Sequence, residues 1–159
     1  DTREGAINSF WAALFLAPFY AILIAFKWAG EDVAVGPLLV VESLAYVIAW
    51  TAFPVLMIPV AKAMKREDRY FGFLAAYNWT QVMQMLAVVV PVLLISSRML
   101  PMEIGSMLLF IAHLLVLIYE GWVIKLALSV GGLEAAGLVL LDLMVGLLLQ
   151  GATHDAIAG

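Results

Sequence analysis

Five long apolar segments follow one another along the chain, separated by short polar stretches. An α-helix needs about 20 mainly apolar residues to cross the hydrocarbon layer of a membrane, and each segment supplies roughly that length. The predicted spans are about 8–29, 38–61, 70–96, 104–128 and 132–151. Charge, glycine or proline interrupts the apolar pattern between them, in GEDVAVGP, KAMKREDRY, SSRMLPME and SVGG. The pattern predicts an all-α, polytopic integral membrane protein, a bundle of five transmembrane helices.

Composition agrees with this interpretation, because 65% of the residues are hydrophobic and only 13% are charged. A soluble domain has about half apolar and a quarter charged residues. A transmembrane barrel needs strands of alternating polarity, which these segments lack. No repeat or linker divides the chain, so residues 1–159 form one predicted domain in the lipid bilayer. A net charge of −4 gives no basis for a nucleic-acid partner, and the absence of cysteine excludes disulfides and thiolate sites.

Basic residues predict the orientation, because cytoplasmic loops hold the excess of lysine and arginine. The loop after the second span carries four of them: Lys62, Lys65, Arg66 and Arg69. With this loop inside, Arg3 and Lys125 also lie inside, whereas Lys27 and Arg98 lie outside. We therefore expect an inner (cytoplasmic) membrane protein of bacterial type, with a cytoplasmic N-terminus and a periplasmic C-terminus. The same four residues could secondarily contact anionic lipid headgroups.

The sequence opens on Asp1, and nothing that resembles a signal peptide precedes the first span. We therefore expect that a natural N-terminal segment is missing. Its content cannot be read from this sequence.

Ionisable residues lie inside several apolar segments, where an ionised side chain costs at least about 2.5 to 3.5 kcal/mol. His113 and Glu120 are seven residues apart in the fourth span, so they share a helix face about 10 Å apart along the axis. Asp142 lies near the middle of the fifth span. Because a short loop joins these two spans, Glu120 and Asp142 should come to similar depths in neighbouring antiparallel helices.

The second and third spans add further polar positions. Asn78, Gln81 and Gln84 lie on one arc of the third span, and Glu42 lies a turn or so inside the second. The spans could therefore close one intramembrane polar seam: Glu42, Asn78, Gln81, Gln84, His113, Glu120 and Asp142.

Four interpretations of this seam stay open. It could be polar glue between helices, with its carboxyl groups kept neutral by burial. It could be a path for protons or a substrate, as in a small transporter or proton-conducting subunit. It could meet a partner subunit. His113 alone could ligate haem or a pigment, although a bis-His haem is excluded because His154 lies in the C-terminal tail.

Catalytic motifs are absent from the sequence, which contains no HExxH, no GxSxG and no glycine-rich phosphate loop. We therefore predict a non-enzymatic protein and expect no cofactor. GGLEAAG offers Gly132, Ala136 and Gly137 for the close approach of another helix.

The order of features resembles the Yip-domain family of five-span membrane proteins, particularly its bacterial members. The resemblance depends on AYNW at the start of the third span and on YEGWVIKLALSVGGLEAAGLVLL, which runs from the fourth span into the fifth. Two features depart from the family pattern. DTREGAINSF lacks the acidic-Leu-aromatic-Gly-Pro signature of eukaryotic members, and TQVMQ replaces the proline that often follows the third-span aromatic.

The resemblance implies a protein that works by association, since eukaryotic relatives engage small GTPases and help to shape or traffic membranes. It implies no chemistry for particular residues. We therefore expect an accessory or scaffold subunit that meets a membrane-protein partner or a second copy of itself, with the transporter as the alternative.

Overall fold

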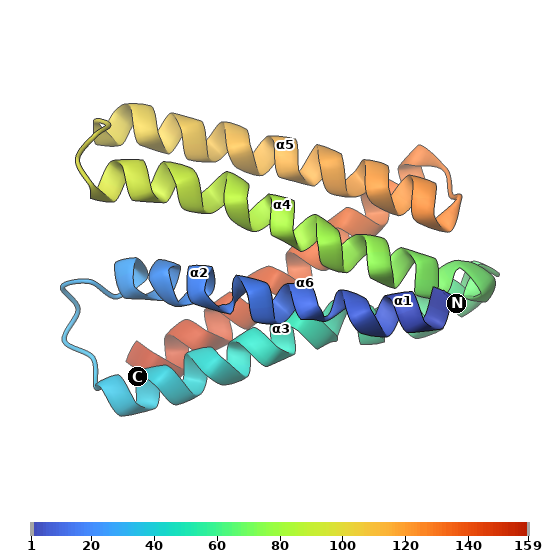
Figure 1. Ribbon diagram of the computed structural model, residues 1–159, viewed down its shortest axis with the longest axis horizontal. Helices are drawn as coiled ribbons and strands as arrows, with labels where there is room; N and C mark the ends of the chain where they lie inside the picture. The colour runs from blue at the N-terminus through green and yellow to red at the C-terminus, as the bar shows by residue number, and fades with distance from the viewer. Residues whose placement is uncertain (1, 159) are drawn as a thin grey trace.

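Residues 2–158 are described in a computed structural model, in which nearly the whole chain is α-helical (Figure 1). The helices are α1 (Thr2–Ser9), α2 (Trp11–Lys27), α3 (Val35–Ala63), α4 (Tyr70–Ser96), α5 (Met102–Leu128) and α6 (Gly132–Ala158), with a 3-10 turn, η1, at Glu67–Arg69. Asp1, before which the missing N-terminal segment was expected, lies outside the described residues.

Five helical segments of the described chain are long and apolar enough to cross a membrane. They are Thr2–Lys27, Val35–Ala63, Glu67–Ser96, Met102–Leu128 and Gly132–Ile157. The predicted all-α fold with five membrane-spanning helices is therefore confirmed, and the protein is of the multi-pass membrane type. Within residues 2–158 no strand interrupts this pattern.

The helix ends differ from the predicted spans in two places. The first span begins at Thr2 instead of about residue 8 and is interrupted at Phe10, where α1 passes into α2. The last helix continues to Ala158, well beyond the predicted end at about residue 151. The reason is that hydropathy marks the part of a helix that prefers lipid, whereas backbone hydrogen bonds continue into polar sequence such as QGATHDAIA.

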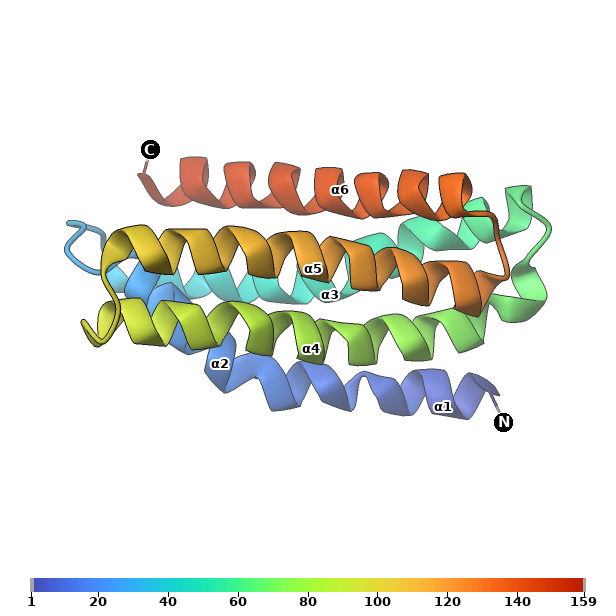
Figure 2. The same cartoon turned by 90° about the horizontal axis from the view of Figure 1, so that it is seen from above.

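The helices are arranged as an antiparallel bundle (Figures 1 and 2). Its N-terminal end holds the start of α1 and the connections α3–α4 and α5–α6, and its C-terminal end holds the connections α2–α3 and α4–α5 and the chain terminus. The hairpin of α4 and α5 lies beside α1 and α2 through α4. In contrast, α6 crosses behind the bundle and contacts both α5 and α3.

The densest packing lies in the half of the bundle nearer its N-terminal end. There Phe53, Phe73 and Tyr77 pack ring against ring, with Met57 and Ile124 buried around them. A smaller cluster forms around Leu16 and Trp50. Toward the C-terminal end, α2 and α4 diverge in Figure 1.

The turn between α5 and α6 is short, and hydrogen bonds connect it to the end of α5 and to the first turn of α6. Ser129 takes the left-handed conformation at φ 50°, and the N–H of Val130 donates to the carbonyl of Lys125. The N–H of Gly131 donates to the carboxylate of Glu134 at 2.6 Å, which satisfies a backbone donor at the start of α6. This turn sets the register of α5 against α6.

Candidate functional site

The carboxyl groups of Glu120 on α5 and Asp142 on α6 are in direct contact, and we call them the carboxyl pair. Two side chains from α4 hold them. The amide Nε2 of Gln84 donates to Oε2 of Glu120 at 3.3 Å, and the hydroxyl of Tyr77 donates to both oxygens of Asp142 at 3.0 and 3.1 Å. Three spanning helices therefore meet at two acidic side chains.

Helix register brings the carboxyl pair together. Glu120 is eight residues before the end of α5, about 12 Å along the axis, and Asp142 is ten residues after the start of α6, about 15 Å. Because a short turn joins these two ends, the carboxyl groups reach matching depths. In a hydrocarbon layer about 30 Å thick, both depths are far from either surface.

Among the described residues, the hydrogen-bond partners of the carboxyl pair include no positively charged side chain. Gln84 and Tyr77 are uncharged donors, and Glu120 is only 3% exposed. Its Oε1 has no hydrogen-bond donor within the described part of the chain. Two carboxylates in contact at low dielectric repel each other, and a proton shared between them would relieve that repulsion.

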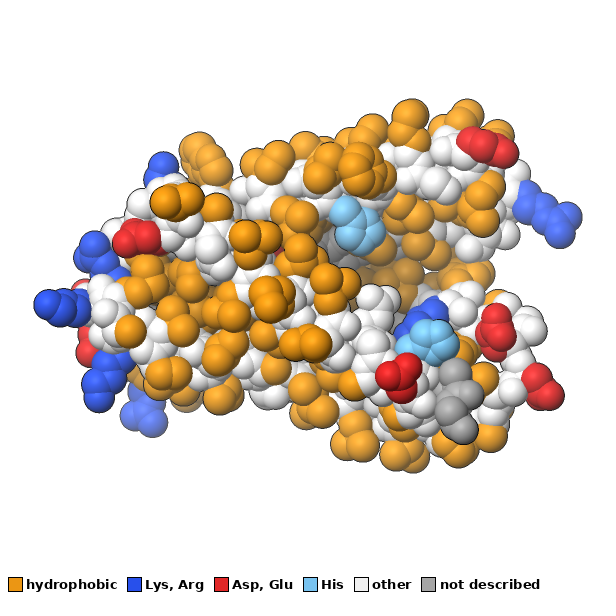
Figure 3. All heavy atoms as spheres, turned by 180° about the vertical axis from the view of Figure 1, so that it is seen from behind, with side chains coloured by type: hydrophobic (Ala, Val, Ile, Leu, Met, Phe, Trp, Pro, Cys, Tyr) orange, Lys and Arg blue, Asp and Glu red, His pale blue; other side chains and the backbone are white. Residues whose placement is uncertain are grey.

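A cavity of about 340 Å³ lies beside the carboxyl pair, and we call it the inner cavity. Side chains of α2, α3, α4 and α5 line it, among them Tyr77 and Gln84, the two residues that hold the carboxyl pair. The carboxyl groups are thus one hydrogen bond behind the cavity wall. On the face seen in Figure 3, a histidine side chain lies at the rim of a hollow between helices.

Gln81 and His113 are the other predicted polar residues that line the inner cavity. His113 is exposed, and its Nδ1 lies 2.7 Å from the carbonyl oxygen of Leu109. It lies on the same face of α5 as Glu120, two turns away. Gln81, Gln84 and His113 therefore gather around one cavity, whereas Glu120 lies behind Gln84 and Asn78 lies elsewhere.

Glu42 lies in a different place, toward the C-terminal end of the bundle between α2 and α3. It accepts hydrogen bonds from Tyr20 at 2.8 Å and Trp28 at 2.8 Å, and it forms a salt bridge with Lys27 at 3.0 Å. We call this group the Glu42 clasp. Since a positive charge and two further donors satisfy the carboxylate, the clasp is a structural connection between α2 and α3.

Asn78 also lies apart from the inner cavity. Its Nδ2 donates to the hydroxyl oxygen of Ser9 at 2.8 Å, and the Ser9 hydroxyl donates in turn to the carbonyl of Ala6. All side-chain atoms of Asn78 are buried, and its Oδ1 has no partner among the described residues. This contact connects α4 to the end of α1, just before the interruption at Phe10.

The structure thus distributes the seven predicted seam residues over three places. Gln81, Gln84, His113, Glu120 and Asp142 belong to the inner cavity and carboxyl pair, whereas Glu42 and Asn78 have separate partners. Sequence reasoning did not identify Tyr77 as the donor to Asp142, or Lys27 as the counter-charge of Glu42. The positions of these residues along their helices could have suggested both contacts. Tyr77 lies one turn beyond Phe73 in α4, and Lys27 is the last residue of the helix that precedes Glu42.

The four basic residues of the α3–α4 connection lie at the N-terminal end of the bundle, away from all three places. Figure 3 shows lysine and arginine side chains gathered at this end. Within residues 2–158, no group of three or more His, Asp or Glu side chains could hold a metal ion. No protein family, curated protein or solved structure matches this chain.

Proposed function

We propose that the protein is a small proton-coupled transporter or proton-conducting subunit, and that the carboxyl pair is its proton-binding site. The observation that carries this proposal is the contact between Glu120 and Asp142, with Oε1 of Glu120 unpartnered, beside the inner cavity. A carboxyl pair with one proton can release it and bind it again without a large rearrangement. This is the chemistry that a proton path inside a membrane requires.

Polar glue explains the carboxyl pair less well. Interhelical hydrogen bonds in membranes contribute only about 0.6 kcal/mol on average, whereas an ionised carboxylate costs at least about 2.5 kcal/mol. Two neutral amides at these positions could hold α5 to α6 without that cost. The Glu42 clasp illustrates how a structural carboxylate is satisfied, because it has a lysine as its partner. Among the residues that the structure describes, Glu120 and Asp142 are held by uncharged donors only.

The inner cavity supports the proposal because it reaches the hydrogen-bond partners of both carboxyl groups. The hydroxyl of Tyr77 lies between the cavity and Asp142, and it can pass a proton by exchanging its own. His113, another titratable side chain, lines the same cavity. Protons that enter the cavity therefore have a chain of groups toward the carboxyl pair.

Proton flux into proteoliposomes tests the proposal. The purified protein is reconstituted with a pH-sensitive dye inside the vesicles, and flux is driven by an imposed pH difference. We expect Asp142→Asn and Glu120→Gln each to abolish the flux while the variants keep the wild-type elution volume. Glu103→Gln, at the exposed start of α5, is the matched control and should retain it. Wild-type protein without flux, or an Asp142→Asn variant with undiminished flux, would reject the proposal.

A second candidate function is association as a non-enzymatic accessory or scaffold subunit, as the resemblance to the Yip-domain family implies. The observation in its favour is a groove of about 530 Å³ between α5 and α6, lined in part by Gly121, Gly132, Ala135 and Ala136. Small residues allow a further helix to approach closely. The partner is then a helix of another membrane protein or of a second copy.

Native mass spectrometry of gently solubilised protein tests this candidate. Ala136→Leu fills the groove and should remove the partner or the second copy, whereas Ala152→Leu, on α6 but outside the groove, should not. A monomeric wild-type mass without any partner would count against association.

A further inference from the structure

The inner cavity combines a largely apolar lining with several aromatic side chains. Leu16, Leu23 and Val116 are among its apolar residues, and Tyr20, Tyr46, Trp50 and Tyr77 contribute its aromatic rings. Its volume of about 340 Å³ is at the lower end of the range for small-molecule sites, about 300 to 1,000 Å³. The cavity is thus large enough for a compact organic molecule.

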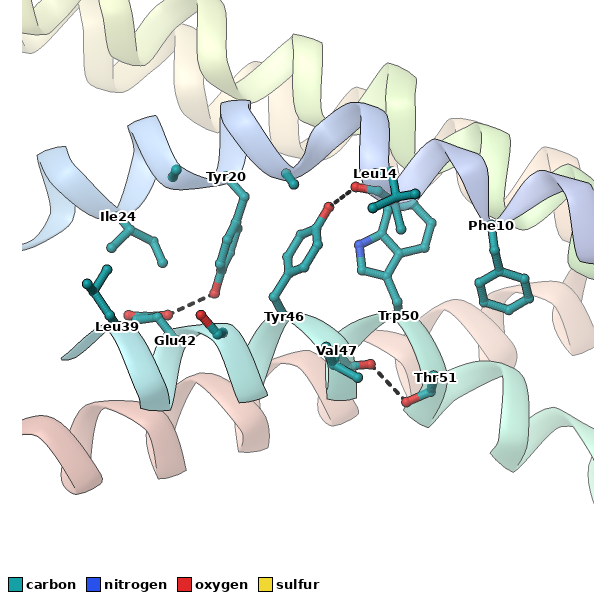
Figure 4. Close-up of a pocket in the computed structure, with 14 residues that line it drawn as sticks. Phe10, Leu14, Tyr20, Ile24, Leu39, Glu42, Tyr46, Val47, Trp50 and Thr51 are labelled. Atoms are coloured by element: carbon teal, nitrogen blue, oxygen red, sulfur yellow. Dashed lines mark hydrogen bonds between the residues drawn. The ribbon is translucent and has the colours of Figure 1, made fainter. Parts of the chain in front are cut away.

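Three of these rings form a wall between the inner cavity and a second space. Tyr20, Tyr46 and Trp50 also line a groove of about 560 Å³ between α2 and α3, which we call the lateral groove. Figure 4 shows Tyr20 reaching from α2 toward Glu42, while Tyr46 and Trp50 reach from α3 toward α2. The ring centroids of Tyr20 and Tyr46 are 4.6 Å apart, and those of Tyr46 and Trp50 are 6.2 Å apart. The wall is one layer of side chains thick.

The lateral groove runs along two spanning helices, from Phe10, just before α2, to Ile24 in α2 and from Leu39 to Thr51 in α3. Small side chains such as Ala13, Ala17 and Ala21 keep it open on the α2 side. A molecule dissolved in the bilayer can therefore reach the aromatic wall without passing through water.

Two features of the inner cavity favour a positively charged ligand. The faces of aromatic rings attract cations, most strongly where water is absent. The carboxyl pair adds negative charge one hydrogen bond behind Tyr77 and Gln84, and Oε1 of Glu120 has no donor. The hydroxyl of Tyr77 donates to Asp142, so its oxygen remains available as an acceptor.

We propose that the inner cavity binds a lipid-soluble organic ammonium ion, held by the rings of Tyr20, Tyr46 and Trp50 and by the charge of the carboxyl pair. This inference rests on the proposed function, because the cation takes the place of the proton. Binding of one monovalent cation releases one proton from the carboxyl pair to the water, so the charge of the site is unchanged.

Other titratable groups near the cavity are few. His113 from α5 lines it, and Tyr20 from α2, Tyr46 from α3 and Tyr77 from α4 present hydroxyl groups. Lys27 and Glu42 lie beyond Tyr20 and neutralise each other in the Glu42 clasp. The charge that the ligand meets is therefore that of Glu120 and Asp142.

Calorimetric titration of the protein in phosphatidylcholine nanodiscs tests the inference. The probe is benzyltrimethylammonium, which carries a permanent charge, and benzenesulfonate, an anion of similar size, is its control. We expect saturable binding of the cation only. Titration in buffers of different ionisation enthalpy should show the release of up to one proton. Asp142→Asn and Trp50→Leu should each weaken binding about tenfold or more, whereas Glu103→Gln should leave it unchanged.

The outcomes separate this inference from the proposed function. Proton flux that depends on Asp142, together with no saturable binding of the cation, would overturn the inference and leave the proton site intact. Equal binding of cation and anion would also overturn it. If Asp142→Asn does not fold, Glu120→Gln gives the same test, because it removes the other carboxyl group of the pair. If the cation binds but no proton is released and no proton flux is measured, the exchange of cation for proton and the proposed function are both overturned.

Discussion

Nζ of Lys27 lies 3.0 Å from Oε1 of Glu42, and this salt bridge connects the end of α2 to the second turn of α3. Trp28 and Tyr20 donate to the same carboxylate. Glu42 is buried, whereas the side chain of Lys27 is 36% exposed. The contact keeps α2 beside α3 at the end of the bundle where α2 and α4 diverge, so it supports one end of the aromatic wall.

Removing the charge of Glu42 should therefore destabilise the protein. We expect Glu42→Gln to lower the free energy of unfolding by about 1 to 3 kcal/mol, because a buried polar group loses its ionic partner. Lys27→Gln should cost at least as much, because it leaves the buried carboxylate of Glu42 without its counter-charge. Denaturant unfolding in detergent micelles measures both. If Glu42→Gln lowered the free energy of unfolding no more than Glu31→Gln in the α2–α3 loop does, the Glu42 clasp would not contribute to stability.

Tyr77 is the hydroxyl donor to Asp142, and Phe can replace it without a change in ring size. Tyr77→Phe should reduce the free energy of unfolding by about 1 to 3 kcal/mol, because Asp142 loses its donor inside the bundle. It should also slow proton flux in proteoliposomes. The control is Tyr119→Phe, whose side chain is 45% exposed on the outside of α5. Equal free energies of unfolding for the two variants would show that the Tyr77 hydroxyl contributes nothing to stability.

Ser9 is the acceptor for the buried amide of Asn78. Ser9→Ala leaves that amide without its partner, so we expect a loss of about 1 to 3 kcal/mol. Amide hydrogen exchange should show faster exchange in α1, the helix that this contact holds against α4. Ser96→Ala is a suitable comparison, because Ser96 is exposed and its hydroxyl donates only to its own helix. Unchanged exchange in α1 would contradict the prediction.

Gly105 allows α5 to lie close to α4. A Cβ atom at this position would overlap Cγ1 and Cδ1 of Ile95, a β-branched side chain with little freedom to move. Gly105→Ala should therefore destabilise the protein by about 1 to 3 kcal/mol, and Ile95→Ala in the same chain should recover part of that loss. Thermal unfolding in detergent measures the effect. Gly146→Ala, which meets open space, should be neutral or slightly stabilising.

The orientation predicted from Lys62, Lys65, Arg66 and Arg69 can be tested by labelling, since the chain contains no cysteine. A membrane-impermeant maleimide should label Ser97→Cys, in the α4–α5 connection, in intact cells. Glu67→Cys, in the α3–α4 connection, should react only after permeabilisation. The two connections lie at opposite ends of the bundle, so the reverse pattern would mean the opposite orientation.

The sequence by itself determined the fold class and the approximate positions of the five long helices. Backbone groups in a hydrocarbon layer must bond within their own segment, so about 20 apolar residues in a row allow little other than a helix. The short polar stretches between the apolar segments located the connections for the same reason. The similar depth of Glu120 and Asp142 also followed from the sequence, because a short turn fixes the register of two antiparallel helices.

Only the tertiary structure decided which faces meet. Apart from a few polar positions such as the arc of Asn78, Gln81 and Gln84, the faces of the spanning helices are apolar, so the sequence contains little amphipathic pattern to orient a helix about its own axis. Consequently it could not separate Glu42, satisfied by Lys27, from Glu120, which lies against a second carboxyl group. It could not reveal that Tyr20, Tyr46 and Trp50 form a wall between two spaces, because those spaces depend on how the helices pack against one another.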